Sequence, residues 1–229
     1  IGETPTSVAE SIPAGSEATF NSGQCASTVA AFDPNTSGKF VIAYRDNANG
    51  DYGTAVIGTV SGTTITFGAE YLFASRIVWS VAISFDPSTA GKFVVIFKDG
   101  SNASFGTAIV GTISGATLSF GSMYIFNSAN SNNILVAFDP NTAGKFVIAY
   151  SDAGNADRGT AVIGTVSGTA ISFGAEYVFN SGLTFEPSVS FDPNTSGKFV
   201  VAYRDNGNSG YGTAVIGTVS GTAISFGAE

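Results

Sequence analysis

Carboxylate and amide side chains are the residues of this chain whose types and spacing could hold a ligand. Four Asp residues are each followed three positions later by an Asn, giving the pairs Asp46/Asn49, Asp99/Asn102, Asp152/Asn155 and Asp205/Asn208. Clustered oxygens of this kind bind Ca²⁺, and an additional carboxylate makes Asp46, Asn49 and Asp51 the candidate metal ligands. Asx turns, in which the Asp side chain accepts a hydrogen bond from the backbone two residues later, explain the same residue pattern and are the interpretation we favour. We therefore expect no metal and no cofactor.

Aromatic and Arg side chains are the candidate anchors for an organic ligand. Trp79, the only Trp, lies three residues after Arg76, and these two residue types dominate the energetics of binding surfaces. The further candidates are Phe185, the four Asn residues above, and a repeated position before a Gly that holds Tyr52, Phe105, Arg158 and Tyr211. Rings at these positions could stack on sugars. The alternative is that they pack between strands, as Trp79 would between repeats.

The chain lacks the usual means of activating a nucleophile. It contains no His, so its Ser residues have no imidazole to act as general base. Its single Cys, Cys25, cannot form a disulfide within the chain. The residues Asp33, Asp86, Asp139 and Asp192 occupy equivalent turn positions, where a structural role is a better explanation than the carboxylate pair of a glycosidase. We therefore expect no catalytic residues and a protein that is not an enzyme.

Composition excludes two classes of partner. The chain has 9 Lys+Arg against 17 Asp+Glu, a net charge of -8, whereas nucleic-acid binding depends on clustered basic residues. No stretch approaches the roughly 18 consecutive apolar residues of a membrane span. An apolar content of 44% predicts a globular chain. We expect neither nucleic-acid binding nor membrane insertion, and the acidic, Lys-poor surface fits an extracellular setting.

A repeat of 53 residues organises the sequence. The motif Phe-Asp-Pro begins at Phe32 and returns at Phe85, Phe138 and Phe191, and the block 159–176 is identical to the block 212–229. Each repeat contains four short runs rich in β-branched and aromatic residues, separated by Gly and Asx clusters, and this pattern predicts strands. Asp-Pro-Asn-Thr-Ser-Gly predicts a tight hairpin between the first two strands, and Ser-Gly does the same between the last two.

Four strands in each of four repeats predict an all-β, four-bladed β-propeller. The predicted domains are an N-terminal arm, 1–17, and a single propeller, 18–229, with repeats 18–70, 71–123, 124–176 and 177–229. The last repeat stops within its fourth strand, and residues 18–20 are expected to pair beside residues 217–225 and close the ring. An open or longer array is the alternative.

The two rims of such a disc differ in how much the repeats have diverged. The Asp-Pro and Ser-Gly hairpins of one rim hardly vary, and we call this the constant rim. The loops 46–52, 99–105, 152–158 and 205–211, with the segments that lead into each first strand, differ strongly and form the variable rim. Loops on rigid scaffolds commonly carry binding. Unconstrained drift is the alternative explanation for this divergence.

These repeats resemble four-bladed β-propellers, including hemopexin-type members of similar repeat length, and repeat-built propeller lectins. The repeated sequence motif Phe-Asp-Pro-Asn-Thr-Ser-Gly-Lys-Phe-Val also resembles repeats in uncharacterised proteins of marine bacteria and phages. The likeness covers residues 18–229 and carries no functional motif, because the Trp-Asp signature and the Asp-box are both absent.

The resulting expectation is a structural or attachment module on a virion or cell surface. It would bind a glycan or another surface protein through the variable rim, alone or as a homo-oligomer or larger assembly. A soluble multivalent lectin is the alternative function.

Overall fold

The computed structural model describes residue 15 and residues 17–228, and this part of the chain is all-β. Its strands are β1 (Cys25–Phe32), β2 (Lys39–Asp46), β3 (Tyr52–Ser61), β4 (Thr64–Phe85), β5 (Lys92–Asp99), β6 (Phe105–Ser114), β7 (Thr117–Phe138), β8 (Lys145–Asp152), β9 (Arg158–Ser167), β10 (Ala170–Phe191), β11 (Lys198–Asp205), β12 (Tyr211–Ser220) and β13 (Ala223–Phe226). Three single-turn 3-10 helices, η1 (Asn47–Asn49), η2 (Ala153–Asn155) and η3 (Asn206–Asn208), lie on the variable rim. No helix in these residues has the length and apolar character needed to cross a membrane.

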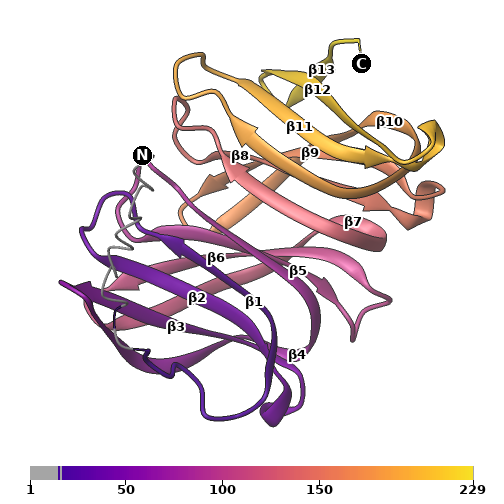
Figure 1. Cartoon of the computed structure of the whole chain (residues 1–229). Helices are drawn as coiled ribbons and strands as arrows, with labels where there is room; N and C mark the ends of the chain where they lie inside the picture. The colour runs from indigo at the N-terminus through magenta and orange to yellow at the C-terminus, as the bar shows by residue number, and fades with distance from the viewer. Residues whose placement is uncertain (1–14, 16, 229) are drawn as a thin grey trace, which may run out of the picture.

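The strands follow one another as a single antiparallel meander from β1 to β13 (Figure 1). Each of β4, β7 and β10 is 22 residues long and serves two neighbouring groups of strands. In β4, for example, residues 64–77 pair with β3 and residues 78–85 pair with β5. We call the resulting groups quartets 1 to 4, and each corresponds to one repeat of the sequence.

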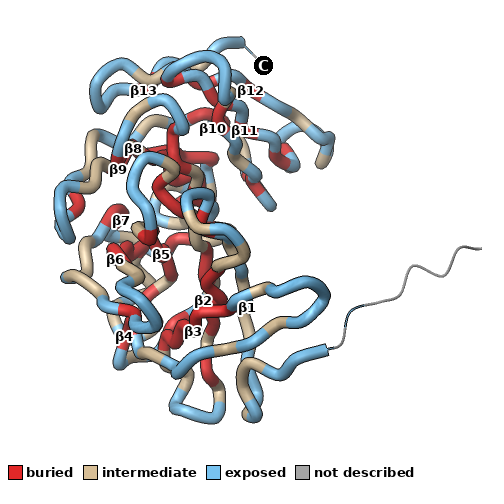
Figure 2. The backbone as a smooth tube through the Cα atoms, turned by 90° about the vertical axis from the view of Figure 1, so that its left-hand side faces the viewer, coloured by how far each residue is buried: buried red, intermediate tan, exposed pale blue. Residues whose placement is uncertain are grey.

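The quartets stack through two chemically different faces. Quartet 1 turns its aliphatic face (Val41, Ala43, Ala55 and Ile57) toward the aromatic face of quartet 2 (Phe93, Val95, Phe97 and Ile109). The same two sets of positions meet between quartets 2 and 3 and between quartets 3 and 4. Burying one such large side chain stabilises the fold by roughly 1.5–3 kcal/mol. We call each contact between an aliphatic face and an aromatic face a seam. Because an internal quartet has a seam on each side, its second strand is apolar on both faces. The buried segments run through the stack (Figure 2).

A Gly in each third strand leaves room for a Phe ring of the second strand. A Cβ on Gly164 would lie 2.1 Å from Cζ of Phe146, and the same close approach occurs at the equivalent Gly of every other repeat. Glycines at the start of the third strands pack against a second ring in the same way, as Gly159 does against Phe179. Gly212, the equivalent in quartet 4, has nothing within 4 Å of that position.

The constant rim fastens each quartet to the next. Asp139 accepts hydrogen bonds from the backbone N of Asn141 in its own turn, at 2.9 Å, and from the backbone N of Gly197 in the next repeat, at 3.2 Å. Lys39 Nζ donates to the carbonyl oxygen of Gly115 at 2.9 Å, which again joins one repeat to the next. These contacts explain why the hairpins of this rim hardly vary among the repeats.

The prediction of a closed four-bladed propeller is wrong, because the meander is open. Among the described residues, β13 pairs only with β12, and β1 pairs only with β2. Residues 18–20 do not complete the last quartet. Instead Phe20 packs its ring on quartet 1, with its centroid 5.2 Å from that of Tyr44 and 5.9 Å from that of Phe67. The first and last quartets therefore form two free ends. The proposed N-terminal arm, 1–17, lies outside the described residues except for Gly15 and Glu17.

The Phe-over-Gly contact generates a prediction about stability. Gly159→Ala pushes its methyl group into the ring of Phe179, and we expect it to lower the free energy of unfolding by about 1–3 kcal/mol. The matched variant Gly212→Ala meets no neighbour and should change that free energy by less than about 0.5 kcal/mol. Urea denaturation of both variants provides the measurement. Equal losses would contradict the role assigned to the ring.

The constant-rim contacts generate a second prediction. Asp139→Ala leaves two backbone N–H groups without their carboxylate partner, and we expect a loss of about 2–3 kcal/mol in the free energy of unfolding. Asp192 occupies the same turn, and no quartet follows it within residues 17–228, so Asp192→Ala should cause a smaller loss in this chain. Chemical denaturation of the two variants side by side tests this ordering, and the reverse ordering would count against the fastening role.

Candidate functional site

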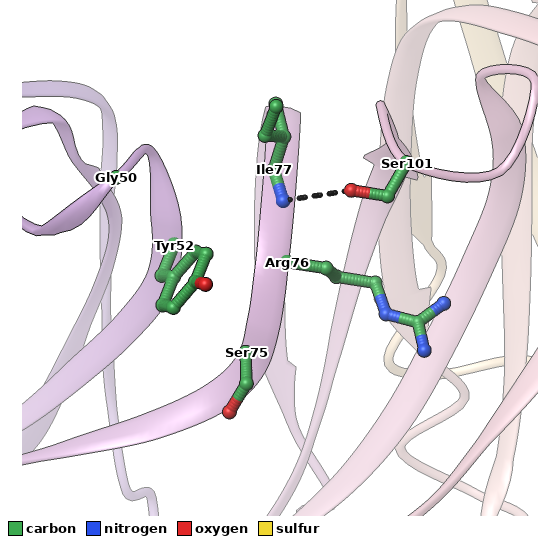
Figure 3. A pocket seen from close by; sticks show the side chains of 6 residues that line it. All are labelled: Gly50, Tyr52, Ser75, Arg76, Ile77 and Ser101. Atoms are coloured by element: carbon green, nitrogen blue, oxygen red, sulfur yellow. Dashed lines mark hydrogen bonds between the residues drawn. The ribbon is translucent and has the colours of Figure 1, made fainter.

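A shallow cleft of about 580 Å³ opens on the variable rim where quartets 1 and 2 meet. Its lining residues are Gly50, Tyr52, Ser75, Arg76, Ile77 and Ser101. Tyr52 begins β3 and lies on one side of the β4 segment, and Ser101, in the loop after β5, lies on the other (Figure 3). The backbone N of Ile77 donates to Ser101 Oγ at 3.1 Å, which ties the loop to the strand.

Arg76 is held beside the cleft by a buried carboxylate. Its Nη1 lies 2.8 Å from Oδ2 of Asp99, which is 1% exposed, whereas 42% of the Arg76 side chain remains exposed. In quartet 4 the corresponding carboxylate, Asp205, receives its hydrogen bond from the amide of Asn180. The second repeat has Ala74 at the position of that Asn, so Arg76 supplies the missing donor. The guanidinium therefore neutralises Asp99 and still presents its outer edge to solvent.

Trp79 lies on β4, three residues after Arg76, and is not among the residues that line the cleft. The guanidinium carbon of Arg45 lies 4.4 Å from the centroid of its ring, and 40% of Trp79 is exposed. A Cβ on Gly100 would lie 2.3 Å from Trp79 Nε1 and 2.8 Å from Ile77 Cγ2, so both side chains pack against this loop. One part of Trp79 packs at the seam and another part faces solvent, and its role as a ligand anchor stays a prediction.

The other predicted anchors lie on different repeats and are not brought to this cleft. Phe105, Arg158 and Tyr211 begin β6, β9 and β12, and Tyr211 is 64% exposed. Arg158 Nη1 donates to Asn155 Oδ1 at 3.3 Å. The ring centroid of Phe185 lies 5.6 Å from the guanidinium carbon of Arg204. Asn102, Asn155 and Asn208 lie in the equivalent loops, and Asn49 lines a neighbouring hollow of about 350 Å³.

The oxygens of the candidate calcium loop are engaged within the loop itself. Asp46 Oδ1 accepts from the backbone N of Ala48 at 3.1 Å and caps η1, as the Asx interpretation predicts. Asp51 Oδ1 accepts from the side chain of Asn47 at 2.7 Å and lies 3.6 Å from Arg45 Nε. Among the described residues no group of three or more His, Cys, Asp or Glu side chains is arranged to hold a metal ion.

Residues other than Gly that adopt a left-handed backbone conformation are concentrated on the variable rim. In the part of the chain that the structure describes, the non-Gly residues with positive φ lie in its loops or in the bulges that enter the first strands, namely Ser27, Asp51, Ser80, Ala103, Ser104, Asn133, Ala156, Asp157, Glu186 and Ser209. The positive-φ positions of the constant-rim hairpins are all Gly. A non-Gly residue in this conformation costs of order 1 kcal/mol or more and is commonly found at functional sites. Folding stability alone would favour Gly on both rims.

Sequence reasoning missed a Tyr–Glu pair that recurs in the first and third repeats, and Glu70 of the first repeat lines the hollow at Asn49. Tyr44 Oη donates to Glu70 Oε1 at 2.7 Å, and Tyr150 Oη donates to Glu176 Oε1 at 2.6 Å. The second repeat replaces both members together, with Phe97 and Met123. This joint replacement is the sequence signal that could have identified the pair. Burial, followed by the hydrogen bond to Glu176, raises the pKa of the Tyr150 hydroxyl well above its ordinary value.

Comparison with known proteins identifies the fold but no family. The sequence matches no protein-family model and no curated protein. Among solved structures, Sqt1 from Chaetomium thermophilum aligns with a TM-score of 0.55 and 12% identity over 83% of this chain and 42% of that one. An exo-beta-1,3-galactanase from Phanerochaete chrysosporium aligns with a TM-score of 0.55 and 12% identity over 94% of this chain and 52% of that one. The chain therefore spans about half the length of these structures, with which it shares the fold alone.

Two expectations change as a result. The predicted likeness to sheet-rich, propeller-like proteins is confirmed at this coarse level, but no match supports a relation to repeats of marine bacteria and phages. The prediction that the chain is not an enzyme is also overturned, because the same fold occurs in a galactanase. This likeness is one of fold alone and carries no catalytic residues over to the chain.

The Tyr–Glu pair generates a prediction about pH. The unfolded chain releases the Tyr150 proton near the ordinary pKa of 10.0, whereas the folded chain retains it. The pair's contribution to stability is therefore fully present below pH 10.0 and falls as the pH rises above it. We expect Tyr150→Phe/Glu176→Met, which reproduces the second repeat, to flatten this alkaline decline. Denaturant midpoints measured across this range test it, and an unchanged slope would contradict it.

Proposed function

We propose that the chain binds a glycan through the variable-rim cleft between quartets 1 and 2. The observation that carries this proposal is the backbone strain, since left-handed non-Gly residues are confined to this rim although Gly is used freely on the other. The divergence of these loops alone would fit drift equally well. Strain retained at repeated positions is harder to explain by drift, because substitution to Gly would relieve it.

The chemistry of the cleft fits a sugar better than an apolar ligand. Tyr52 offers a half-buried ring, and Arg76 and Ser101 offer polar groups on the opposite side of the same strand (Figure 3). Arg76 is positioned by Asp99 at 2.8 Å, so ordering it on binding costs little side-chain entropy. A shallow opening lined by one ring and several donors suits a ligand with many hydroxyl groups. The galactanase of similar fold supports carbohydrate as the ligand class.

The polar side chains that line the cleft are specific to one repeat of the sequence. Positions equivalent to Arg76 hold Gly23, Ala129 and Gly182, and those equivalent to Ser101 also lack a hydroxyl. We therefore propose one principal glycan site per chain, in place of four equivalent sites. A role in attachment at a cell or virion surface follows from such a site if several chains are presented together, and a soluble lectin is the alternative.

A glycan array followed by calorimetry with the best-binding sugar tests the proposal. We expect Tyr52→Ala to weaken binding about tenfold, which corresponds to about 1.4 kcal/mol. The matched control is Tyr211→Ala, which removes the equivalent ring of quartet 4 and should leave the affinity unchanged. Equal weakening by both variants would replace the single cleft with repeated sites. The absence of sugar binding by the intact chain would overturn the proposal.

A further inference from the structure

One of the recurring Asn residues of the variable rim differs from its equivalents in the residue that follows it. Asn49 is followed by Gly50. The equivalent Asn residues are followed by Ala or Ser, and they are Asn102, Asn155 and Asn208. Asn is a thermolabile residue, and it reacts most readily with its own backbone at an Asn-Gly junction, because Gly has no Cβ to block the approach. The first variable-rim loop therefore contains a junction that is chemically distinct from its three equivalents.

The variable-rim loops hold this junction in one backbone conformation. Gly50 follows η1 with a φ of 67°, and Ala156 follows η2 with a φ of 56°, so both adopt the left-handed conformation. The residue after η3 does the same. The loops therefore differ at this position in side chain rather than in backbone shape. Asn155, which precedes Ala156, is an internal control for Asn49.

The turn that contains Asn49 is exposed to solvent and is held by few contacts. Asn49 and Gly50 are both exposed, and no residue of η1 is buried. Short exposed turns open at a small cost in free energy, because little buried surface is lost when they do. Opening of this single turn lets the backbone N of Gly50 reach Cγ of the Asn49 side chain, and water has free access to both atoms.

A second Asn-Gly junction, at Asn206 and Gly207, is held by hydrogen bonds. The backbone N of Gly207 donates to Asp205 Oδ1 at 2.9 Å, so a carboxylate engages the atom that would have to attack. Arg204 Nη2 donates to Asn206 Oδ1 at 3.3 Å and restrains the amide. In the first repeat the corresponding carboxylate accepts its hydrogen bond from the residue before Asn49. The two junctions therefore differ in how firmly the reacting groups are held.

We propose that Asn49 is a site of spontaneous deamidation that alters the neighbouring cleft. The backbone N of Gly50 loses its proton to water and forms a bond to Cγ of Asn49, while the side-chain nitrogen leaves as ammonia. Water then opens the resulting succinimide ring at either of its two carbonyl groups, which gives Asp or isoaspartate at position 49. The reaction consumes one water and releases one ammonia, and it needs no cofactor, oxidant or second protein.

Both products change the wall of the cleft. Each places a new negative charge on the loop that holds Gly50 and Tyr52, two residues that line the cleft. Asn49 also lines its own hollow together with Asp46 and Glu70, so the new carboxylate meets two like charges there. Isoaspartate in addition inserts one carbon into the backbone before Gly50 and displaces that residue. Sugar affinity therefore declines as the chain ages, and this consequence, unlike the reaction itself, rests on the proposed glycan site.

Peptide mapping by mass spectrometry during incubation of the folded chain at neutral pH tests the reaction. Trypsin releases Asn49 in the peptide 46–76 and Asn155 in the peptide 146–158, so the two positions are measured separately. We expect Asn49 to deamidate about tenfold faster than Asn155, with isoaspartate among the products, because Gly removes the steric barrier. Equal rates at the two positions, or a faster reaction at Asn206, would overturn the proposal. An Asn49 that stays intact would do the same.

Reciprocal substitutions separate the junction from its surroundings. Gly50→Ala reproduces the third repeat, and its added Cβ meets the ring of Tyr52 at an ordinary contact distance of 3.6 Å, so the loop is retained. This variant should slow the reaction of Asn49 to the rate of Asn155. Ala156→Gly should accelerate the reaction of Asn155 toward the rate of Asn49. Rates that follow neither substitution would overturn the assignment to the Asn-Gly junction.

Sugar binding provides the functional measurement. Calorimetry with the best-binding sugar compares each aged protein with its own fresh sample. The intact chain should lose affinity with the time course of the covalent change, whereas Gly50→Ala should keep the affinity it has when fresh. An aged chain that is modified but binds as before would overturn the effect on the cleft. A fresh chain that binds no sugar would overturn the proposed function, while the peptide maps would still decide whether Asn49 deamidates.

Discussion

The packing of an aliphatic face on an aromatic face is the interaction on which the rest of this structure depends. A quartet cannot bury both of its apolar faces by itself, so each one needs a neighbour, as in other repeat architectures. The Gly residues opposite the Phe rings and the Asp and Lys contacts of the constant rim all serve this seam. The seam fixes the order and spacing of the quartets, and the variable rim is carried on the frame that it creates.

The two rims show how one scaffold separates stability from recognition. The constant rim places Gly at every left-handed position of its hairpins and uses its polar side chains to bind the following repeat. The variable rim keeps strained Ser, Asp, Asn and Glu residues, and at one seam it exchanges an Asn for the pair Ala74 and Arg76. That local exchange converts a buried amide–carboxylate contact into a charged group at the edge of a cleft.

Strands and turns could be predicted from the sequence because their signals are local. The Asp-Pro hairpins and the Asx caps follow from side chains that bond their own backbone, and the structure shows Asp46 and Asp139 in these roles. Ring closure could not be predicted in this way. The period of the repeat specifies which faces meet, but the curvature of the stack depends on how β4, β7 and β10 bend from one quartet into the next.

The candidate site was predictable only in part for a similar reason. Tyr52, Arg76 and Trp79 were identified by residue type, and the structure places them around one seam. Their grouping depends on the register that sets Tyr52 opposite Ile77 and on the reach of Arg76 to Asp99. The Tyr–Glu pair is indicated by the joint change to Phe97 and Met123 in the second repeat. This signal is visible only when the repeats are compared position by position.

The uniformity of the seams has a consequence for how such a gene can change. Blocks 159–176 and 212–229 are identical, so recombination out of register can insert or delete one whole repeat. Because every junction uses the same two faces, the product retains matched junctions whatever its number of repeats. The number of repeats can therefore change between descendants without a compensating mutation. The junction that contains Arg76 lies outside these blocks and is retained.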